Sequence, residues 1–459
     1  MPEHTITLFL KDNNKISKAI KVSNDTSYDE LLKIASSKFR SKIFTILSND
    51  GCIYDPQMIK SGLKLYCSTK IINGNQFIFV PEKTIPVNIV AVNSYICDES
   101  IKQLQSLQKL EDVTDIFGMP DLHVGKGCPI GAVTLTSKTI YPHLIGEDIG
   151  CGMLFLKTSL PEDLVGKKLT KIASHLDLEG PYNNTSLEFI DVTKFSNYEN
   201  EKAFLDDVGN YFYNQLGTIG AGNHFLELQK IDKIFDANFA EQYGMQQDYL
   251  YLTIHSGSRG IGESVLNIFE KNHCSDDYKN GHSDALLWAK CNRRNIAKRF
   301  SEQVNGCHLE PIVDMFHNYY EEITVDRVQY TVHRKGASAT NNELIIIPGS
   351  RGSKTYVVKP IKNDITHGFS VSHGAGRKIA RTKMYDIIND ASVDDKQIKI
   401  FGSEIENIVI CEDHHLLYEE ACCAYKDIDI VIDDLVKLGL VVVIASLSPV
   451  LTYKYRSAR

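Results

Sequence analysis

Short apolar runs that end in glycine-rich, polar segments are the feature of this sequence that most constrains its fold. Runs of this length are typical of buried β-strands, and they occur at residues 250–254, 343–347 and 440–446. Helical periodicity covers residues 262–304 and 421–438. Strands and amphipathic helices in this mixture predict a large mixed α/β domain. Its functional site is expected at the strand ends, where the glycine-rich motifs begin.

Residues 1–70 have a different pattern. Strands are expected at residues 5–10, 16–22, 43–47, 52–54 and 63–67, with a helix after Thr26 or Ser27 and a turn at Asn49-Asp50-Gly51. This order resembles a ubiquitin-like β-grasp module, and doublecortin-type domains share it. We therefore predict an α+β protein with a module at 1–70, a linker at 71–85 and a catalytic domain at 86–459. The large domain is expected to open with a strand at 87–92 and a helix at 98–110.

Composition narrows the protein class. The chain has 459 residues and a net charge of -8, so it has no overall nucleic-acid signature, and a polyanion would need a local basic groove. Its eleven cysteines contain no CxxC pair, which favours reduced thiols in a cytoplasmic or nuclear protein. The longest apolar run, near 438–447, is too short to span a bilayer, and no secretory signal is expected. We expect a soluble, intracellular protein that does not bind membranes.

A carboxylate and a thiol stand three residues apart in the run GEDIGCGM at 146–153. Asp148 offers a hard oxygen ligand and Cys151 a soft sulfur ligand, a pairing that suits a borderline divalent metal. Such a cysteine alone is more often a packing residue. Four further segments strengthen the metal interpretation, each rich in glycine or basic residues and each bearing a histidine: GNHFLE at 222–227, HSGSRG at 255–260, HRKGAS at 333–338 and SHGAGR at 372–377. Together they predict a metal-nucleotide site.

The histidines of these segments fall into two kinds. His255 and His333 each follow an apolar strand, and His224 follows a glycine-rich turn, as expected of metal ligands that point into a cleft. His373 is surrounded by small residues and followed by Arg377, which would let a phosphate approach the ring. A nucleophilic imidazole that attacks phosphorus fits this setting better than a metal ligand. The turn IPGSRGS at 347–353 could cradle a phosphate.

Taken in order, eight segments resemble the RtcB family of RNA-splicing and repair ligases over residues 86–459: MPDLHVGKGCPIGA, GEDIGCGM, GNHFLE, HSGSRG, HRKGA, PGSRG, SHGAGR and AYKDID. The resemblance implies two manganese ions, GTP as a co-substrate and a histidine that becomes guanylylated. Cys151 would bridge the two metals. His255 and His333 would complete one metal site, and Asp148 and His224 the other.

The same resemblance assigns the remaining site residues. His373 matches the nucleophile, and Asp121 in PDLH matches an acidic position that orients it. The guanine nucleotide would be bound at Asn223, His224, Phe225, Leu226, Glu227, Pro348, Gly349, Ser350, Arg351, Thr355, His373, Gly374, Ala375, Gly376 and Lys454.

The implied reaction joins an RNA 2′,3′-cyclic phosphate or 3′-phosphate end to a 5′-hydroxyl end, in RNA repair or tRNA splicing. Arg351, Thr355 and Cys422 depart from the common family pattern and resemble a divergent branch associated with RNA repair. Two alternatives stand beside ligation: a metal-dependent RNA-end phosphoesterase or nucleotidyltransferase that does not seal, and a non-catalytic RNA-binding scaffold. The intact His373 and Lys454 argue against the scaffold. RNA is the expected partner, with a protein partner through residues 1–70 and an activating factor as further possibilities.

Overall fold

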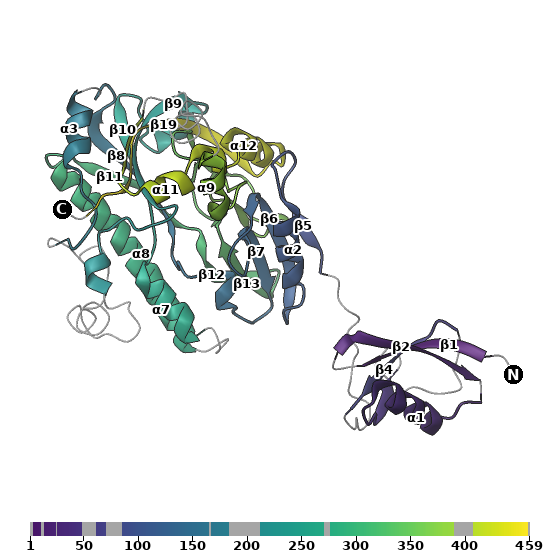
Figure 1. The fold of residues 1–459 in the computed structure, drawn as a ribbon. Helices are drawn as coiled ribbons and strands as arrows, with labels where there is room; N and C mark the ends of the chain where they lie inside the picture. The colour runs from purple at the N-terminus through teal and green to yellow at the C-terminus, as the bar shows by residue number, and fades with distance from the viewer. Residues whose placement is uncertain are drawn as a thin grey trace. The chain divides into compact units, whose positions relative to one another are not determined.

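The computed structural model describes residues 3–10, 13–23, 25–47, 61–69, 85–164, 167–182, 212–269, 276–389 and 407–457 (Figure 1). It divides into two compact units, Met1–Thr84 and Ile85–Arg459. Both contain sheets and helices, which confirms the expected α+β class. The expected turn at 49–51, the strand at 52–54 and nearly all of the linker lie outside the described residues, so the proposed domain limits stay a prediction.

The first unit is a sheet covered on one face by a helix. Its strands are β1 (Glu3–Leu10), β2 (Asn13–Ser23), β3 (Thr45–Leu47) and β4 (Lys64–Ser68), in the order β2-β1-β4-β3, and its helix is α1 (Tyr28–Phe39). Strand β1 runs antiparallel to β2 and parallel to β4. Ser27 caps α1 in a capping box with Glu30, as the sequence predicted. The described part agrees with a β-grasp order, while the ubiquitin-like kinship stays a prediction.

The second unit is built on two larger sheets. Within the described residues, the first has the order β11-β8-β10-β9-β19-β16-β15, with β18 paired to β19; the second has the order β12-β13-β7-β6-β5; and β14 pairs with β17. The strands are β5 (Val87–Ile89), β6 (Val113–His123), β7 (Ile130–Thr136), β8 (Gly152–Pro161), β9 (Phe225–Ile234), β10 (Tyr249–Ser256), β11 (Leu309–Phe316), β12 (Asn318–Val325), β13 (Val328–Lys335), β14 (Ala337–Ala339), β15 (Ile345–Pro348), β16 (Thr355–Pro360), β17 (Ser370–Ser372), β18 (Ile408–Cys411) and β19 (Val441–Tyr455).

Helices cover these sheets. They are α2 (Asp98–Leu107), α3 (Lys167–His175), α6 (Ala237–Gln242), α7 (Gly260–Phe269), α8 (Asp276–Gln303), α9 (Arg381–Asn389), α11 (His414–Glu419) and α12 (Ile428–Lys437). Helix α8 packs on β8, β10 and β11, α2 packs on β6, and α12 packs on β19 and β6 (Figure 1). No helix in the described ranges combines the length and the apolar character that a bilayer crossing requires.

Several predicted elements have different limits in the structure. The helix expected at 98–110 ends at Leu107, and the helical stretch expected at 262–304 contains two helices, α7 and α8. The strand expected at 440–446 continues to Tyr455, because β19 pairs with β9, β16 and β18 and its polar residues are buried within the sheet. The helix expected at 421–438 begins only at Ile428, since Asp427 caps it and residues 422–424 form a 3-10 turn. The strand expected at 87–92 ends at Ile89.

A buried carboxylate explains why that strand stops early. Asp434 of α12 accepts hydrogen bonds from the backbone N–H groups of Val92, Asn93 and Ser94 at 2.8–2.9 Å. These groups are therefore unavailable to a β-ladder, and the chain turns over the end of α12. Burial alone would raise the pKa of Asp434, but the three N–H donors hold it below its usual range.

We predict that Asp434→Asn lowers the free energy of unfolding of the second unit by about 2 to 4 kcal/mol at neutral pH, because charge-assisted bonds to buried donors are lost. Since the pKa of Asp434 is lowered on folding, its contribution is present above the ordinary aspartate pKa and is lost as the pH falls through the folded-state value. The difference between the wild type and the variant should therefore shrink in acid. Urea unfolding followed by the fluorescence of Trp288, the chain's single tryptophan, measures this unit specifically.

Asp433→Asn is the matched control. Its side chain is half exposed and pairs with Lys437 one turn along the same helix. Such a surface pair contributes little, so this variant should unfold like the wild type. Equal destabilisation by the two substitutions would contradict the role assigned to Asp434.

Candidate metal centre and nucleophile

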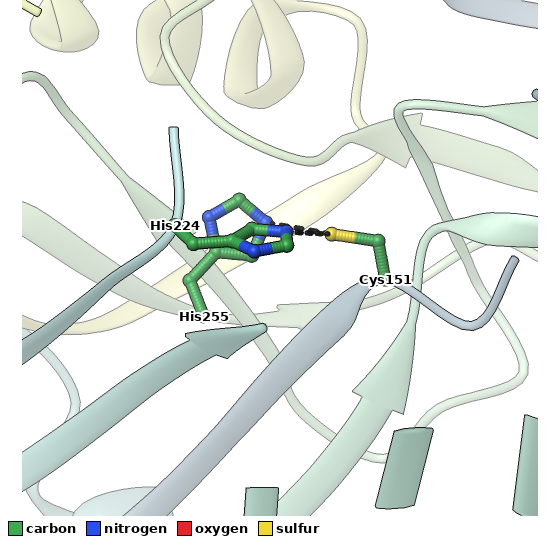
Figure 2. A group of neighbouring side chains, drawn as sticks. All are labelled: Cys151, His224 and His255. Atoms are coloured by element: carbon green, nitrogen blue, oxygen red, sulfur yellow. Dashed lines mark hydrogen bonds between the residues drawn. The ribbon is translucent and has the colours of Figure 1, made fainter. Parts of the chain in front are cut away.

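The Cys151, His224 and His255 side chains meet at one edge of the large sheet (Figure 2). Cys151 directly precedes β8, His224 directly precedes β9, and His255 lies near the end of β10, which runs antiparallel between them. The antiparallel register therefore brings the two strand starts and the strand end together. The Sγ of Cys151 lies 3.3 Å from Nε2 of His224 and 3.1 Å from Nε2 of His255. All three side chains are buried.

Asp148 joins the cluster from the side of His224. Its Oδ2 lies 2.7 Å from Nε2 of His224, while Nδ1 of the same ring donates to the Ile219 carbonyl at 3.1 Å. The backbone bond fixes the ring and directs Nε2 toward the cluster. Burial alone would raise the pKa of Asp148, but His224 and Arg259 hold it below its usual range. This carboxylate is therefore ionised at neutral pH and can act as a hard ligand.

His317 joins the cluster from the other side, and sequence reasoning missed it. It stands between β11 and β12, and its Nε2 lies 3.2 Å from Nε2 of His255. Burial, reinforced by neighbouring imidazoles, lowers the pKa of both His255 and His317 well below the usual range. Both rings are therefore neutral, as metal ligation requires. A signal was present in the sequence: His317 follows the apolar run IVDMF, just as His255 follows its own strand.

The structure does not bring His333 to this cluster, and the ligand role expected of it is corrected. Its Nδ1 donates to the Thr134 carbonyl at 3.1 Å, and its Nε2 accepts the Tyr141 N–H at 2.9 Å. With both ring nitrogens used, His333 has no lone pair left for a metal. His333 lies on β13 of the five-stranded sheet. The Thr134 carbonyl on the neighbouring strand β7 and the Tyr141 N–H satisfy the hydrogen-bonding groups of its ring.

The five donor groups fit a pair of borderline divalent cations. They form a chain from Asp148 through His224, Cys151 and His255 to His317, with successive donor distances of 2.7, 3.3, 3.1 and 3.2 Å. Cys151 is in the middle, where one thiolate could serve both metals. Burial and the nearby Asp148 carboxylate raise the pKa of the Cys151 thiol well above its usual range. The neutral imidazoles of His255 and His317 face each other, and the Cys151 thiol lies beside them. A divalent cation that accepts their lone pairs would stabilise this arrangement.

His373 and Asp121 form a second buried pair. Nδ1 of His373 donates to Oδ2 of Asp121 at 2.6 Å, and the His373 backbone N–H donates to the same oxygen at 3.1 Å. Burial alone would raise the pKa of Asp121, but His373 and Lys426 hold it below its usual range. The bond fixes the tautomer, so Nε2 carries the free lone pair. The His373 ring lies 4.7 Å from the ring of His317, centroid to centroid, so the pair adjoins the metal cluster.

The backbone around Asp121 is shaped to hold this pair. Strand β6 leaves its regular pairing with β7 between Gly118 and His123, and Nζ of Lys426 donates to the Pro120 and Leu122 carbonyls at 2.8 and 2.7 Å. Gly376 has a φ of +71° and lies so close that a Cβ would come within 2.1 Å of the Asp121 carbonyl. Only glycine fits there, which explains one glycine of the SHGAGR motif.

The structure brings most of the expected nucleotide-binding segments together. The Ala375 N–H donates to the Pro348 carbonyl at 3.0 Å, so the PGSRG turn packs against the segment that follows His373. Gln229 donates to both Glu227 and Thr355 at 2.8 Å, which links β9 to β16. Lys454 on β19 donates to the Gly222 carbonyl at 2.8 Å, beside Asn223.

Glu227 has an unusual setting among these residues. Its Oε1 accepts the Thr452 hydroxyl at 2.8 Å, and Oε2 accepts from Gln229. Burial raises the pKa of Glu227 to about 7, against the opposing effect of these bonds and of Lys454 and Arg351. A carboxyl group that is partly protonated at neutral pH can both donate and accept hydrogen bonds, which suits recognition of a polar base edge.

Helix α8 contacts the segments that carry the candidate metal ligands through Arg293, which is fully buried. Its Nη1 donates to the Gly150 carbonyl beside Cys151 at 2.9 Å and to the Ser256 carbonyl beside His255 at 3.0 Å. Its Nε and Nη2 donate to Oδ1 of Asp314 on β11 at 2.8 and 2.6 Å. One planar guanidinium thus connects three segments that carry or adjoin ligands.

A cavity of about 340 Å³ opens beside the cluster. Its lining carries charges of both signs and includes the two ligands of the Asp148 side; it consists of Glu147, Asp148, Gln215, Ala221, His224, Arg259, Gly260 and Glu263.

Comparison with known proteins identifies relatives of this chain. The family described as tRNA-splicing ligase RtcB matches residues 103–209, 195–275 and 266–455. The chain is similar to the RNA-splicing ligase RtcB2 of Escherichia coli strain ATCC 25922, with 39% identity over 368 residues, 77% of this chain and 92% of the relative. It is also similar to the RNA-splicing ligase RtcB of Escherichia coli K12, with 30% identity over 68% of this chain and 84% of the relative. The tRNA-splicing ligase RtcB of Nanoarchaeum equitans is 28% identical over 81% of this chain and 95% of its own length.

Metal binding should distinguish His317 from His333. We predict that His317→Ala lowers manganese affinity by at least about tenfold because a donor is lost, whereas His333→Ala leaves bound metal per folded chain unchanged. Elemental analysis after dialysis against a manganese series, together with thermal melting to confirm folding, measures both. Loss of metal in the His333 variant with full occupancy in the His317 variant would reverse the ligand assignment.

Arg293→Lys tests whether the guanidinium positions the ligands. A lysine cannot reach three acceptors in fixed directions, so metal affinity should fall by about 10-fold to 100-fold. Arg294→Lys is the matched control, because Arg294 is the next residue, is 41% exposed and lies 3.8 Å from the other oxygen of Asp314. Equal manganese affinity in the two variants would rule out the positioning role.

Proposed function

The chain belongs to the RtcB family of RNA-splicing ligases, and we propose that it joins RNA 2′,3′-cyclic phosphate or 3′-phosphate ends to 5′-hydroxyl ends through a guanylylated His373. It is an RNA ligase of the RtcB type. GTP would be the co-substrate and two manganese ions the metals, with RNA repair or tRNA splicing as the setting.

The observation that carries this proposal is the Asp121–His373 pair next to the five-donor cluster. A phosphoesterase would need the metals alone, whereas an imidazole whose Nδ1 is held by a buried carboxylate is suited to covalent catalysis. Its ring adjoins His317 at the end of the donor chain, so a phosphoryl group could contact the metals and the nucleophile together. This arrangement favours ligation over the non-sealing and scaffold alternatives.

In the first step, Nε2 of His373 attacks the α-phosphorus of GTP. A nitrogen–phosphorus bond forms, the bond to the leaving pyrophosphate breaks, and the Nδ1 proton stays on the imidazole. Asp121 accepts a hydrogen bond from that proton and stabilises the positive charge that develops on the ring. The buried Lys426 holds the backbone on both sides of Asp121 and keeps the carboxylate in place.

Two transfers complete the proposed reaction. A cyclic phosphate end is first opened by water to a 3′-phosphate, whose oxygen then attacks the guanylyl phosphorus and frees His373. The RNA now ends in a phosphoanhydride with a good leaving group. The 5′-hydroxyl of the second RNA attacks the RNA phosphorus, GMP leaves, the hydroxyl proton is released and a phosphodiester forms.

The metals and the nucleotide would be held by different residues. We assign Asp148 and His224 to one metal, His255 and His317 to the other, and Cys151 to both; the bound cations would neutralise charge on the phosphoryl oxygens. Residues of the PGSRG turn and the SHGAGR segment would contact the phosphates through backbone N–H groups. Glu227 and Lys454, brought together on β9 and β19, would contact the guanosine.

We predict that the protein incubated with manganese and α-labelled GTP acquires a covalent label that acid removes and alkali does not, as expected for a phosphoramidate. His373→Ala should abolish the label. Asp121→Asn should slow labelling by at least about 100-fold, because the amide favours the wrong tautomer and cannot stabilise the cationic ring. Gel autoradiography measures each rate.

His123→Gln serves as the control, since His123 contacts the Asp121 carbonyl through Nδ1 at 2.8 Å but is not the proposed nucleophile. It should keep most of the labelling. A manganese-loaded wild type without label would refute the guanylyl-histidine mechanism. Cyclic-phosphate RNA that is opened but never joined to a 5′-hydroxyl strand would identify a phosphoesterase instead.

A further inference from the structure

The two units carry opposite net charges. Residues 1–84 contain twelve lysines and arginines against eight aspartates and glutamates, a net charge of +4, so the remainder of the chain carries -12. A basic module attached to an acidic enzyme is the charge pattern expected when the module contacts a polyanion. None of the residues assigned to the metals or the nucleotide lies in the first unit.

One face of the first unit's sheet is turned away from its core. Core residues such as Ile6, Leu8 and Leu65 point toward α1. The alternate residues of the same strands form the outer face: Thr5, Thr7, Phe9, Ser17, Ala19, Lys21, Lys64 and Tyr66. Each of these eight residues is exposed or partly exposed. Ser68 on β4 and its neighbours Thr45 and Leu47 on β3 lie on the same face beside Tyr66 and are buried, so the exposed part of the face is formed by β2, β1 and the start of β4. Glu3 stands at the next alternate position, at the start of β1 and opposite Ser23, at the far end of the strand from Phe9.

Two aromatic rings lie side by side in the middle of the outer face. Phe9 on β1 and Tyr66 on β4 are directly paired across the parallel ladder, with ring centroids 5.5 Å apart and planes 23° apart. Neither belongs to the hydrophobic core of the unit. Exposed Lys64 neighbours Thr7 on β1, and exposed Lys21 pairs with Thr5, so cationic side chains flank the rings.

We propose that the outer face of the N-terminal sheet binds single-stranded RNA. Bases would stack on Phe9 and Tyr66, and the backbone phosphates would contact Lys21 and Lys64. Partly exposed, stacked rings beside lysines form a platform that accepts any base sequence. Because the platform is covalently joined to the ligase, it raises the local concentration of RNA at the enzyme. That the bound RNA is a substrate of the ligase rests on the proposed function.

The chemistry of the face favours RNA over a protein partner. A protein-binding patch is usually centred on a continuous apolar surface, whereas the outer face contains threonines, a serine and two lysines around one aromatic pair. The two lysines that flank the rings match a phosphate backbone.

The test compares full-length variants in binding a short, labelled, single-stranded RNA with a 5′-hydroxyl end, measured by fluorescence anisotropy. Phe9→Ala/Tyr66→Ala should weaken binding about tenfold or more through lost stacking. Lys21→Gln/Lys64→Gln should weaken it and should lower the slope of log affinity against log salt by about 1.4, the value for two phosphate contacts on a single strand. Phe9→Tyr, which keeps a ring, should bind like the wild type.

Lys33→Gln/Lys38→Gln is the matched control, because it removes the same charge from exposed positions on α1, across the core from the outer face. It should leave RNA affinity nearly unchanged. If both lysine double variants weakened RNA binding equally, the loss of affinity would come from net charge alone, and the proposal would be overturned. Unchanged RNA affinity in Phe9→Ala/Tyr66→Ala would also overturn it.

Guanylylation with GTP in the absence of RNA separates this proposal from the proposed function. All outer-face variants should label like the wild type. If no protein labels but RNA affinity still depends on Phe9 and Tyr66, the ligase mechanism fails and the platform stands. If labelling is normal and the outer-face variants bind RNA with the affinity of the wild type, the platform is refuted.

Discussion

The whole catalytic unit depends on the burial of a thiol between two pairs of donors at one sheet edge. Cys151, His224 and His255 meet because β8, β9 and β10 are adjacent and antiparallel, and Asp148 and His317 extend the row on either side. Burial lowers the pKa of His255 and His317 and raises the pKa of the Cys151 thiol. Neutral imidazoles and a thiol that face one another in this way suit cations that accept their lone pairs, so the fold provides a candidate metal site.

The proposed nucleophile and the candidate metal ligands are held by different parts of this unit. Asp121 reaches His373 from β6 of the other large sheet, where an irregular stretch of strand is held by Lys426. His373, the proposed nucleophile, is thereby oriented by groups outside the five-donor cluster, yet its ring centroid lies 4.7 Å from that of His317. The active site therefore forms only when both sheets are assembled. Arg293 of α8 gives the metal side a similar support, because it connects the segments of Cys151, His255 and Asp314.

The N-terminal unit adds a different kind of surface. Its core is closed by α1, and the opposite face of its sheet combines an aromatic pair with lysines. A ligase must hold two RNA ends whose sequences vary, so contacts that ignore base identity suit it. Phosphate charge and base stacking are two such contacts. The opposite net charges of the two units agree with a division of labour in which one unit contributes RNA affinity and the other contributes chemistry.

The sequence by itself determined the α+β class, a helix capped at Thr26 or Ser27 and the motifs that carry Asp148, Cys151, His224, His255, Asp121 and His373, because glycine-rich segments and strand periodicity are local properties of the chain. It also indicated the RtcB family. It did not distinguish His317 from His333, since both follow apolar strands. Only the tertiary structure decided between them: β7 and the Tyr141 N–H satisfy one ring, while the edge of the large sheet leaves the other facing His255. Ligand identity depends on which nitrogen remains unpaired after folding, and that is set by neighbours distant in sequence.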